Sequence, residues 1–183
     1  SKAKFKINEF IDKLKLEVKE SIVKETVGFR VVKTFPDTKV IMYSDRHYLK
    51  QALIQLLINA FKFTHEGLVE VNYQLKGDDR IIFKVSDTSI QLAEDKAQMI
   101  NDYFSKSVNG LIHDQSGMGV SMNVVKKIVT LLGAELQYQP ASPHGKVFSI
   151  IHPIAKQSNA KEMDTFSMDN LATITDKWIG KTI

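Results

Sequence analysis

The spacing of apolar residues along the chain predicts a mixture of helices and strands. Some segments carry an apolar residue at every third or fourth position, which is helical spacing, and others alternate apolar and polar residues, which is strand spacing. The predicted helices cover about residues 8–24, 46–64, 94–104 and a segment from Gly119 to Gly133, and the predicted strands cover residues 29–35, 40–43, 69–75, 81–86, 135–139 and 146–152. From residue 155 onward the chain is polar. One domain followed by a polar tail is therefore expected.

The predicted helix over residues 46–64 has a narrow polar stripe on an otherwise apolar surface. Its apolar residues are Leu49, Ala52, Leu53, Ile54, Leu56, Leu57, Ile58, Ala60 and Phe61. Gln51, Gln55, Asn59 and Lys62 follow one another at i, i+4, i+8 and i+11, so a helix of 3.6 residues per turn stacks them within about one quadrant. Two interpretations are open: the stripe is the solvated edge of the helix, or its amides and ammonium group face a polar ligand.

Particular residues are predicted to begin or end these elements. Asn8 is expected to cap the first helix and Ser44-Asp45 the second, because their side chains accept hydrogen bonds from the free N–H groups of a first helical turn. Gly28 and Gly67 are expected to close these two helices. Lys76-Gly77-Asp78-Asp79 is predicted to form a hairpin turn.

Candidate chemistry lies at the end of one strand and in one long loop. Asp87 ends the predicted strand 81–86, a position that often holds functional groups but at least as often only caps a turn. Residues 105–119 show no periodicity, and loops of this length are usually functional or disordered. The loop ends in Gly117-Met118-Gly119 before a predicted helix, whose first N–H groups and dipole favour an anion. The GxG pattern alone is weak evidence, because many such loops only turn the chain.

Composition and charge exclude several classes of protein. The chain has 183 residues, of which 43% are apolar and 25% charged, which is typical of a packed soluble domain. It has no run of roughly 18 apolar residues that would cross a membrane. It also has no cysteine, which favours a cytoplasmic compartment. The net charge is +4, but acidic and basic residues are interleaved, so no nucleic-acid partner is expected.

The order of four segments resembles the catalytic ATP-binding domain of sensor histidine kinases. These segments are DRHYLKQALIQLLINAFKFTHEG, VSDTSI, SGMGVSMNVVKKIVTLLGAEL and HGKVFSIIHP. The resemblance covers about residues 5–154. It implies an α+β fold, the two-layer α/β sandwich shared with gyrase-type, chaperone and mismatch-repair ATPases, in which helices pack on one face of a mixed, mostly antiparallel sheet. It also implies a catalytic domain over residues 1–154 and a tail or linker over residues 155–183.

The resemblance assigns roles to particular residues, with ATP and Mg²⁺ as the expected ligands. Asn59 matches the asparagine that ligates the Mg²⁺ bridging the phosphates, and Lys62 matches the basic residue near those phosphates. Gln55 stands where the family usually has an earlier asparagine. Asp87 matches the carboxylate that accepts a hydrogen bond from the adenine amino group. Residues 105–116 match the lid over the nucleotide.

The glycine pattern of the family is only partly kept. Gly117 and Gly119 match the glycines whose amides approach phosphate, but Ser89, Gln91 and Ser121 stand where the family has glycine. A β-carbon at a position of positive φ costs on the order of 1 kcal/mol. Each replacement could therefore block the nucleotide or merely shift it. Two functions are therefore open: an ATP-dependent protein-histidine kinase domain, or a degenerate module of the same fold that serves as a regulatory or interaction domain. A third, weaker alternative is an ATPase of the wider superfamily, which would hydrolyse ATP to drive a conformational change without a histidine partner.

The resemblance also implies partners. In the family the phosphate is accepted by a histidine on a separate helical dimerisation domain, and none of the five histidines here lies on such a helix. That domain of the parent chain, and a receiver domain or response regulator, are the expected partners. The terminal DKWIGKTI is similar to the lead-in of a receiver domain, which would make the parent a hybrid kinase, and a docked or unstructured tail is the alternative. No membrane contact by this fragment is expected, although the parent protein can be membrane-anchored.

Overall fold

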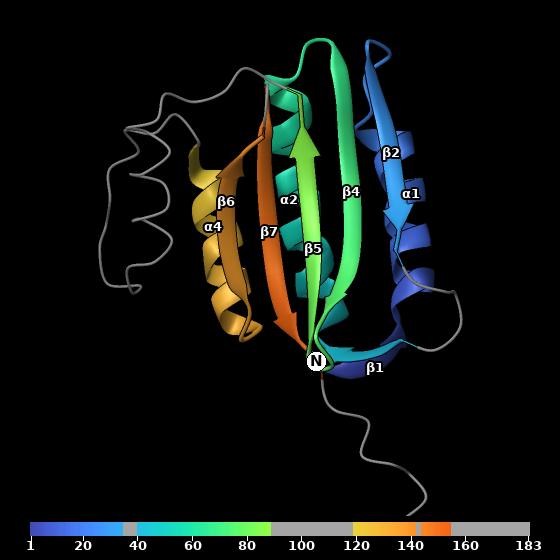
Figure 1. The fold of residues 1–183 in the computed structure, drawn as a ribbon, viewed down its shortest axis with the longest axis vertical. Coiled ribbons are helices and arrows are strands. Elements are labelled where there is room, and N and C mark those ends of the chain that lie inside the picture. The colour runs from blue at the N-terminus through green and yellow to red at the C-terminus, as the bar shows by residue number, and fades with distance from the viewer. Residues whose placement is uncertain (35–39, 89–118, 142–143, 155–183) are drawn as a thin grey trace, which may run out of the picture.

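The computed structural model describes residues 1–34, 40–88, 119–141 and 144–154 (Figure 1). The predicted helix over residues 94–104, most of the predicted loop 105–119 and the tail from residue 155 lie outside these residues. Figure 1 shows a sheet in front of helices, with the strands running along the long axis of the molecule.

In the described part of the chain, the larger sheet has five strands in the order β2-β4-β5-β7-β6. These strands are β2 (Val27–Lys33), β4 (Gly67–Lys76), β5 (Arg80–Asp87), β6 (Glu135–Pro140) and β7 (Lys146–Pro153). Only β2 and β4 pair in parallel, and the other neighbours are antiparallel. A separate antiparallel pair is formed by β1 (Ala3–Lys6) and β3 (Ile41–Ser44). The sheet is thus mixed and mostly antiparallel, as expected.

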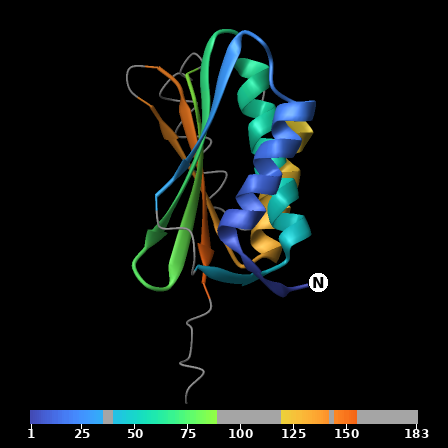
Figure 2. The same cartoon turned by 90° about the vertical axis from the view of Figure 1, so that its right-hand side faces the viewer.

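The described helices are α1 (Ile7–Ser21), α2 (Arg46–Phe63) and α4 (Gly119–Leu131). Figure 2 shows the larger sheet edge-on with all of these helices on one side of it, and Figure 1 shows α2 between α1 and α4. The apolar stripe of α1 (Ile7, Phe10, Ile11, Leu14 and Val18) is buried in this core, together with Phe83 from the sheet. The predicted two-layer α/β sandwich is therefore confirmed.

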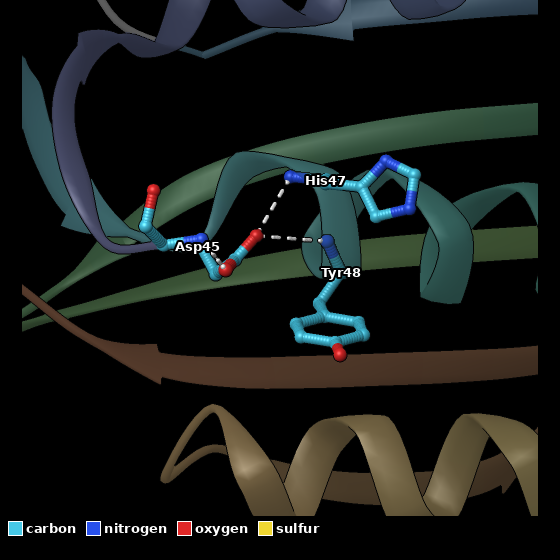
Figure 3. Close-up of polar contacts among 4 residues, drawn as sticks. Asp45, His47 and Tyr48 are labelled. Atoms are coloured by element: carbon cyan, nitrogen blue, oxygen red, sulfur yellow. Dashed lines mark hydrogen bonds and ion pairs between the residues drawn. The ribbon is translucent and has the colours of Figure 1, made fainter.

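The start of α2 has the predicted cap. Asp45 Oδ1 accepts hydrogen bonds from the backbone N–H groups of His47, at 3.1 Å, and Tyr48, at 3.3 Å (Figure 3). These are donors that a first helical turn otherwise leaves unpaired. The cap fixes where α2 begins, and the helix then runs for 18 residues toward the opposite end of the sheet.

The start of α1 differs from the prediction. The N-cap position is Lys6, which makes no side-chain cap hydrogen bond, and Asn8 lies inside the first turn. Asn8 is buried, and its Oδ1 accepts a 2.6 Å hydrogen bond from the hydroxyl group of Tyr73. Because Tyr73 is fully buried, its hydroxyl needs a partner, and Asn8 supplies one. The predicted N-cap role of Asn8 was therefore wrong.

Other predicted boundaries also shift. Gly28 was expected to close α1 but lies within β2, and α1 ends at Ser21. Gly67 was expected to close α2, but α2 ends at Phe63 and Gly67 begins β4 with φ of 125°. A β-carbon on Gly67 would lie 2.0 Å from Thr88 Oγ1, so glycine permits a close approach there.

The structure differs from the sequence prediction at one short strand and at one exposed apolar residue. Strand β1 was not predicted, because four residues are too few for alternation to be recognised. Ile58 was assigned to the apolar surface of α2, yet it is exposed. The other predicted apolar residues of this helix, apart from the half-buried Ile54, are buried.

Candidate functional site

The polar stripe of α2 becomes more buried toward the C-terminal half of the helix and then reaches the surface. Gln51 is exposed, Gln55 is half-buried, Asn59 is only 6% exposed and Lys62 is exposed again. Burying an amide group costs free energy unless it finds a polar partner. The stripe is therefore more than a solvated edge, since Asn59 places an amide inside the molecule near the end of α2.

Asp87 is the last residue of β5, as predicted, and it is only 5% exposed. It is paired with Val69 of β4 on one side and with Lys146 of β7 on the other. Side chains alternate between the two faces of a strand, so Asp87 lies on the same face as Val85 and Phe83, which belong to the core beneath the helices. The carboxylate group thus lies on the helix-covered face at the end of the sheet.

The first residue of β7, Lys146, brings an ammonium group to the same place. Lys146 is 6% exposed and directly opposite Asp87 in the ladder. Its Nζ lies 4.6 Å from the centroid of the Phe63 ring at the end of α2, and Nζ of Lys62 lies 5.5 Å from that centroid. Both distances suit a cation–π interaction. Since Phe63 follows Asn59 by one helical turn, these contacts bring the end of α2 close to Asp87.

Tyr138 of β6 adds a buried hydroxyl group to this end of the sheet. Tyr138 is 2% exposed, and in the described part of the chain its hydroxyl has no hydrogen-bond partner. Burial raises its pKa, and the negative charge of Asp87 raises it further. Burial lowers the pKa of Lys146, whereas Asp87 opposes this effect. Asp87 therefore acts electrostatically on groups from the neighbouring strand β7 and from β6, the next strand beyond it.

The approach of β7 to Asp87 requires a glycine. Gly145 has φ of 116°, and a β-carbon there would lie 1.8 Å from the carbonyl oxygen of Asp87. No side chain fits between these two backbone segments. Gly145 thereby allows β7 to begin with Lys146 directly opposite Asp87.

Only some of the remaining predicted site residues lie within the residues that the structure describes. Gly119 is the first residue of α4 and Ser121 lies in its first turn. Ser89, Gln91 and Gly117 lie outside the described residues. In Figure 1, α2 and β5 end, and α4 and β7 begin, at the upper end of the molecule. The structure thus brings Asn59, Lys62, Asp87 and the start of α4 to one end of the sandwich.

The chemistry of these groups fits a charged, polar ligand. An amide oxygen such as that of Asn59 suits Mg²⁺, which usually keeps several waters and binds few protein ligands. Within the described ranges there is no cluster of three or more His, Cys, Asp or Glu residues, so no closed protein cage for a metal is found there. None of the described helices is both long and apolar enough to cross a membrane.

Sequence reasoning missed Lys146, Phe63 and Tyr138. The signal for Lys146 was available in part, because the predicted turn before residue 146 makes Lys146 the first residue of a strand. Its partner Asp87 follows only from the register of β5 and β7, which a single sequence does not contain. Phe63 and Tyr138 were interpretable only as ordinary apolar positions of a helix and a strand.

Comparison with known families gives a match over much of the chain. Residues 44–156 match the family model described as histidine kinase-, DNA gyrase B-, and HSP90-like ATPase. The autoinducer 2 sensor kinase/phosphatase LuxQ of Vibrio cholerae is 32% identical over 127 residues, which is 68% of this chain and 15% of LuxQ. The circadian input-output histidine kinase CikA of Synechococcus elongatus is 32% identical over 114 residues, or 62% of this chain and 15% of CikA. The chain therefore spans about 15% of the length of these relatives.

Solved structures share the fold. The catalytic domain of histidine kinase ThkA has a TM-score of 0.67 at 19% identity, with 86% of this chain and 99% of that one covered. The mycobacterial sensor histidine kinase MprB has a TM-score of 0.63 at 20% identity, with 85% and 99% covered. The family match covers more than half of the chain and includes Asn59, Asp87 and Lys146. The chain belongs to the family of histidine kinase-, DNA gyrase B- and HSP90-like ATPases.

Proposed function

We propose that this chain is the ATP-binding catalytic domain of a sensor histidine kinase, which transfers the γ-phosphate of ATP to a histidine on a separate dimerisation domain. The relatives LuxQ and CikA are named as sensor or histidine kinases. The observation that carries the proposal is the burial of Asn59 and Asp87, an amide and a carboxylate, at one end of the sandwich beside the start of α4.

Asp87 is the proposed determinant of the base. A carboxylate accepts hydrogen bonds and donates none, so it suits the exocyclic amino group of adenine. Its burial excludes water, which makes a hydrogen bond to a ligand stronger than one at the surface. Ser89 and Gln91, which follow Asp87 in the sequence, are proposed to lie along the same ligand.

Asn59 and Lys62 are proposed to serve the phosphate end of the ligand. Asn59, with Gln55 one turn before it, would offer amide oxygen to Mg²⁺, and Lys62 would offer positive charge to the phosphates. When bound, Mg²⁺ supplies neutralisation of the phosphate charge. Gly117, Gly119 and Ser121 are proposed to bring backbone N–H groups of the α4 start to the same phosphates.

In the proposed reaction the residues of this chain position and neutralise the nucleotide. The bond between the γ-phosphorus and the bridging oxygen of ADP breaks, and a bond forms between that phosphorus and an imidazole nitrogen of the accepting histidine. Such a transfer depends on positioning and charge rather than on a covalent intermediate with the domain. The accepting domain comes from the parent chain, and ThkA is solved in a complex with its response regulator TrrA. An equivalent regulator or receiver domain is the proposed next partner, with residues 155–183 as the linker.

Isothermal titration calorimetry of Mg-ATP binding to the whole chain tests the proposal. Asn59→Ala should weaken Mg-ATP binding about tenfold or more, since it removes the proposed amide ligand, and should abolish most of the effect of adding Mg²⁺. Gln51→Ala is the matched control, because Gln51 lies on the same stripe but is exposed. Equal affinity of the Asn59→Ala variant and the unchanged chain for Mg-ATP would refute the proposed role of Asn59. No binding at millimolar Mg-ATP by either chain would favour a non-catalytic module of the same fold.

A further inference from the structure

The small sheet of β1 and β3 has one exposed face that is both apolar and basic. Ile41 and Tyr43 lie two residues apart on β3 and therefore share a face, and they are 40% and 47% exposed. Their cross-strand partners on β1 are Lys6 and Lys4, respectively. Lys6 forms an ion pair with Glu9, whereas no ion pair of Lys4 is found within the described residues. The outer face of the small sheet thus combines ammonium groups with large apolar side chains.

The inner face of the small sheet is anchored in the molecule. Met42 is fully buried in the core, and its cross-strand partner Phe5 packs against the same core. Ser44 is buried as well and lies in hydrogen-bond contact with His152 of β7. Figure 2 shows the small sheet across the lower end of the helices. Because the inner face is held in this way, the fold keeps the outer face turned away from the core.

The last described residue lies close to the small sheet. Ser44 Oγ is 2.8 Å from Nε2 of His152, and the described chain ends only two residues later, at Ile154. A stretch of seven residues, 155–161, comes next, and seven residues span up to about 25 Å when extended. The chain from residue 162 onward can therefore reach the outer face of the small sheet.

Residues 162–176 have a sequence that is complementary to this face. The segment contains no basic residue, and its acidic residues are Glu162, Asp164, Asp169 and Asp176. Large apolar residues stand between them: Met163, Phe166, Met168, Leu171 and Ile174. Binding to the outer face would remove apolar surface from water on both sides and bring carboxylate groups close to ammonium groups.

We propose that the outer face of the small sheet binds residues 162–176 of the same chain. A segment joined by a short linker has an effective concentration on the order of millimolar, so a weak contact is enough to hold it there. The small sheet lies at the lower end of the molecule in Figure 1, and the proposed nucleotide site lies at the upper end. The inference goes beyond the proposed function and does not depend on nucleotide binding.

Paramagnetic broadening of backbone amide signals in the whole chain tests this binding. The chain has no cysteine, so Ser167→Cys gives the segment a single position for a nitroxide label. We expect the label to remove the signals of residues 41–44 more strongly than the signal of Asp79. Asp79 is the internal reference, because its carbonyl oxygen accepts a 2.6 Å hydrogen bond from the N–H group of Ile154. Equal broadening at both places would overturn the proposal, since an unbound segment passes both.

Substitutions on the outer face supply the controls. Tyr43→Ser removes apolar surface and Lys4→Glu reverses the charge beside it, and each should restore the signals of residues 41–44. Leu16→Ser should leave them broadened, because Leu16 is an exposed apolar residue in the middle of α1. Unchanged broadening in both outer-face variants would overturn the proposal. Broadening in a mixture of nitroxide-labelled chain and separate isotope-labelled chain would assign the contact to a second copy and likewise overturn it.

Discussion

Ser44 and His152 are joined by a buried hydrogen bond across 108 residues of sequence: Ser44 Oγ lies 2.8 Å from His152 Nε2. The other ring nitrogen, Nδ1, lies 2.6 Å from the carbonyl oxygen of Pro153. A carbonyl oxygen only accepts, so Nδ1 donates to it, and Nε2 of the neutral ring accepts from the Ser44 hydroxyl group. This pair connects the small sheet, through β3, to the C-terminal end of β7.

The burial of His152 makes stability depend on pH. Burial lowers the pKa of His152 from its ordinary value of 6.5, and Lys2 adds slightly to this, while the hydrogen bond to Pro153 opposes it. The unfolded chain therefore binds the proton more readily than the folded chain does. We expect the contribution of neutral His152 to the free energy of unfolding to be fully present above about pH 6.5. This contribution is lost as the pH falls toward the lowered pKa of the folded state.

Urea unfolding between about pH 5 and pH 8 measures this effect. His152→Gln, which has no proton to bind in this range, should reduce the loss of stability at the acidic end. His47→Gln is the control, since His47 is exposed at the start of α2. The explanation fails if the His152 variant loses stability with falling pH as steeply as the unchanged chain.

The hydrogen bond between Tyr73 and Asn8 should contribute to stability. Tyr73→Phe removes the hydroxyl group that donates to Asn8 Oδ1 at 2.6 Å between β4 and α1. We expect a loss of about 1 kcal/mol in the free energy of unfolding, because a buried acceptor loses a donor. Tyr43→Phe, at an exposed tyrosine, should change it by less than about 0.5 kcal/mol. Equal effects of the two substitutions in urea unfolding would contradict this role of Asn8.

Gly145→Ala should damage both stability and the site. The added β-carbon would lie 1.8 Å from the carbonyl oxygen of Asp87, which is backbone and cannot move aside cheaply. Gly133→Ala is a matched control, since Gly133 also has positive φ but no atom within 4 Å of the added carbon. The control should cost on the order of 1 kcal/mol from backbone conformation alone. We expect Gly145→Ala to cost clearly more and to weaken nucleotide binding, and thermal unfolding that ranks the two variants equally would contradict this.

The long amphipathic segments of this chain were predictable from sequence. The apolar stripe of α1, the unequal faces of α2 and the alternation in β4 each repeat often enough to fix the element and its buried face. The boundaries were less predictable. Asn8 looked like a cap because the sequence does not reveal that Tyr73, on another element, requires its amide oxygen.

Candidate site residues could be proposed where a residue lies on a periodic element or at its end. Asn59 and Asp87 were singled out as candidates in this way, and the structure buries both of them at the end of the sandwich. Lys146 was missed because its place at the site depends on its pairing with Asp87 in the ladder of β5 and β7. Phe63 was missed because its ring reaches the site only through its contact with the ammonium group of Lys146. Pairing between distant strands is a tertiary property, and apolar spacing does not encode it.

The central claim, that this domain binds Mg-ATP, is tested most directly by thermal unfolding of the whole chain with no ligand, with Mg-ATP, and with ATP plus a chelator of Mg²⁺. A ligand at a hundred times its dissociation constant stabilises by about 2.7 kcal/mol, and each kcal/mol raises the midpoint of a chain of this size by roughly 2–4 °C. We expect a rise of several degrees with Mg-ATP, and we expect Asp87→Asn and the chelator each to remove most of it. An unchanged midpoint at millimolar Mg-ATP would contradict it.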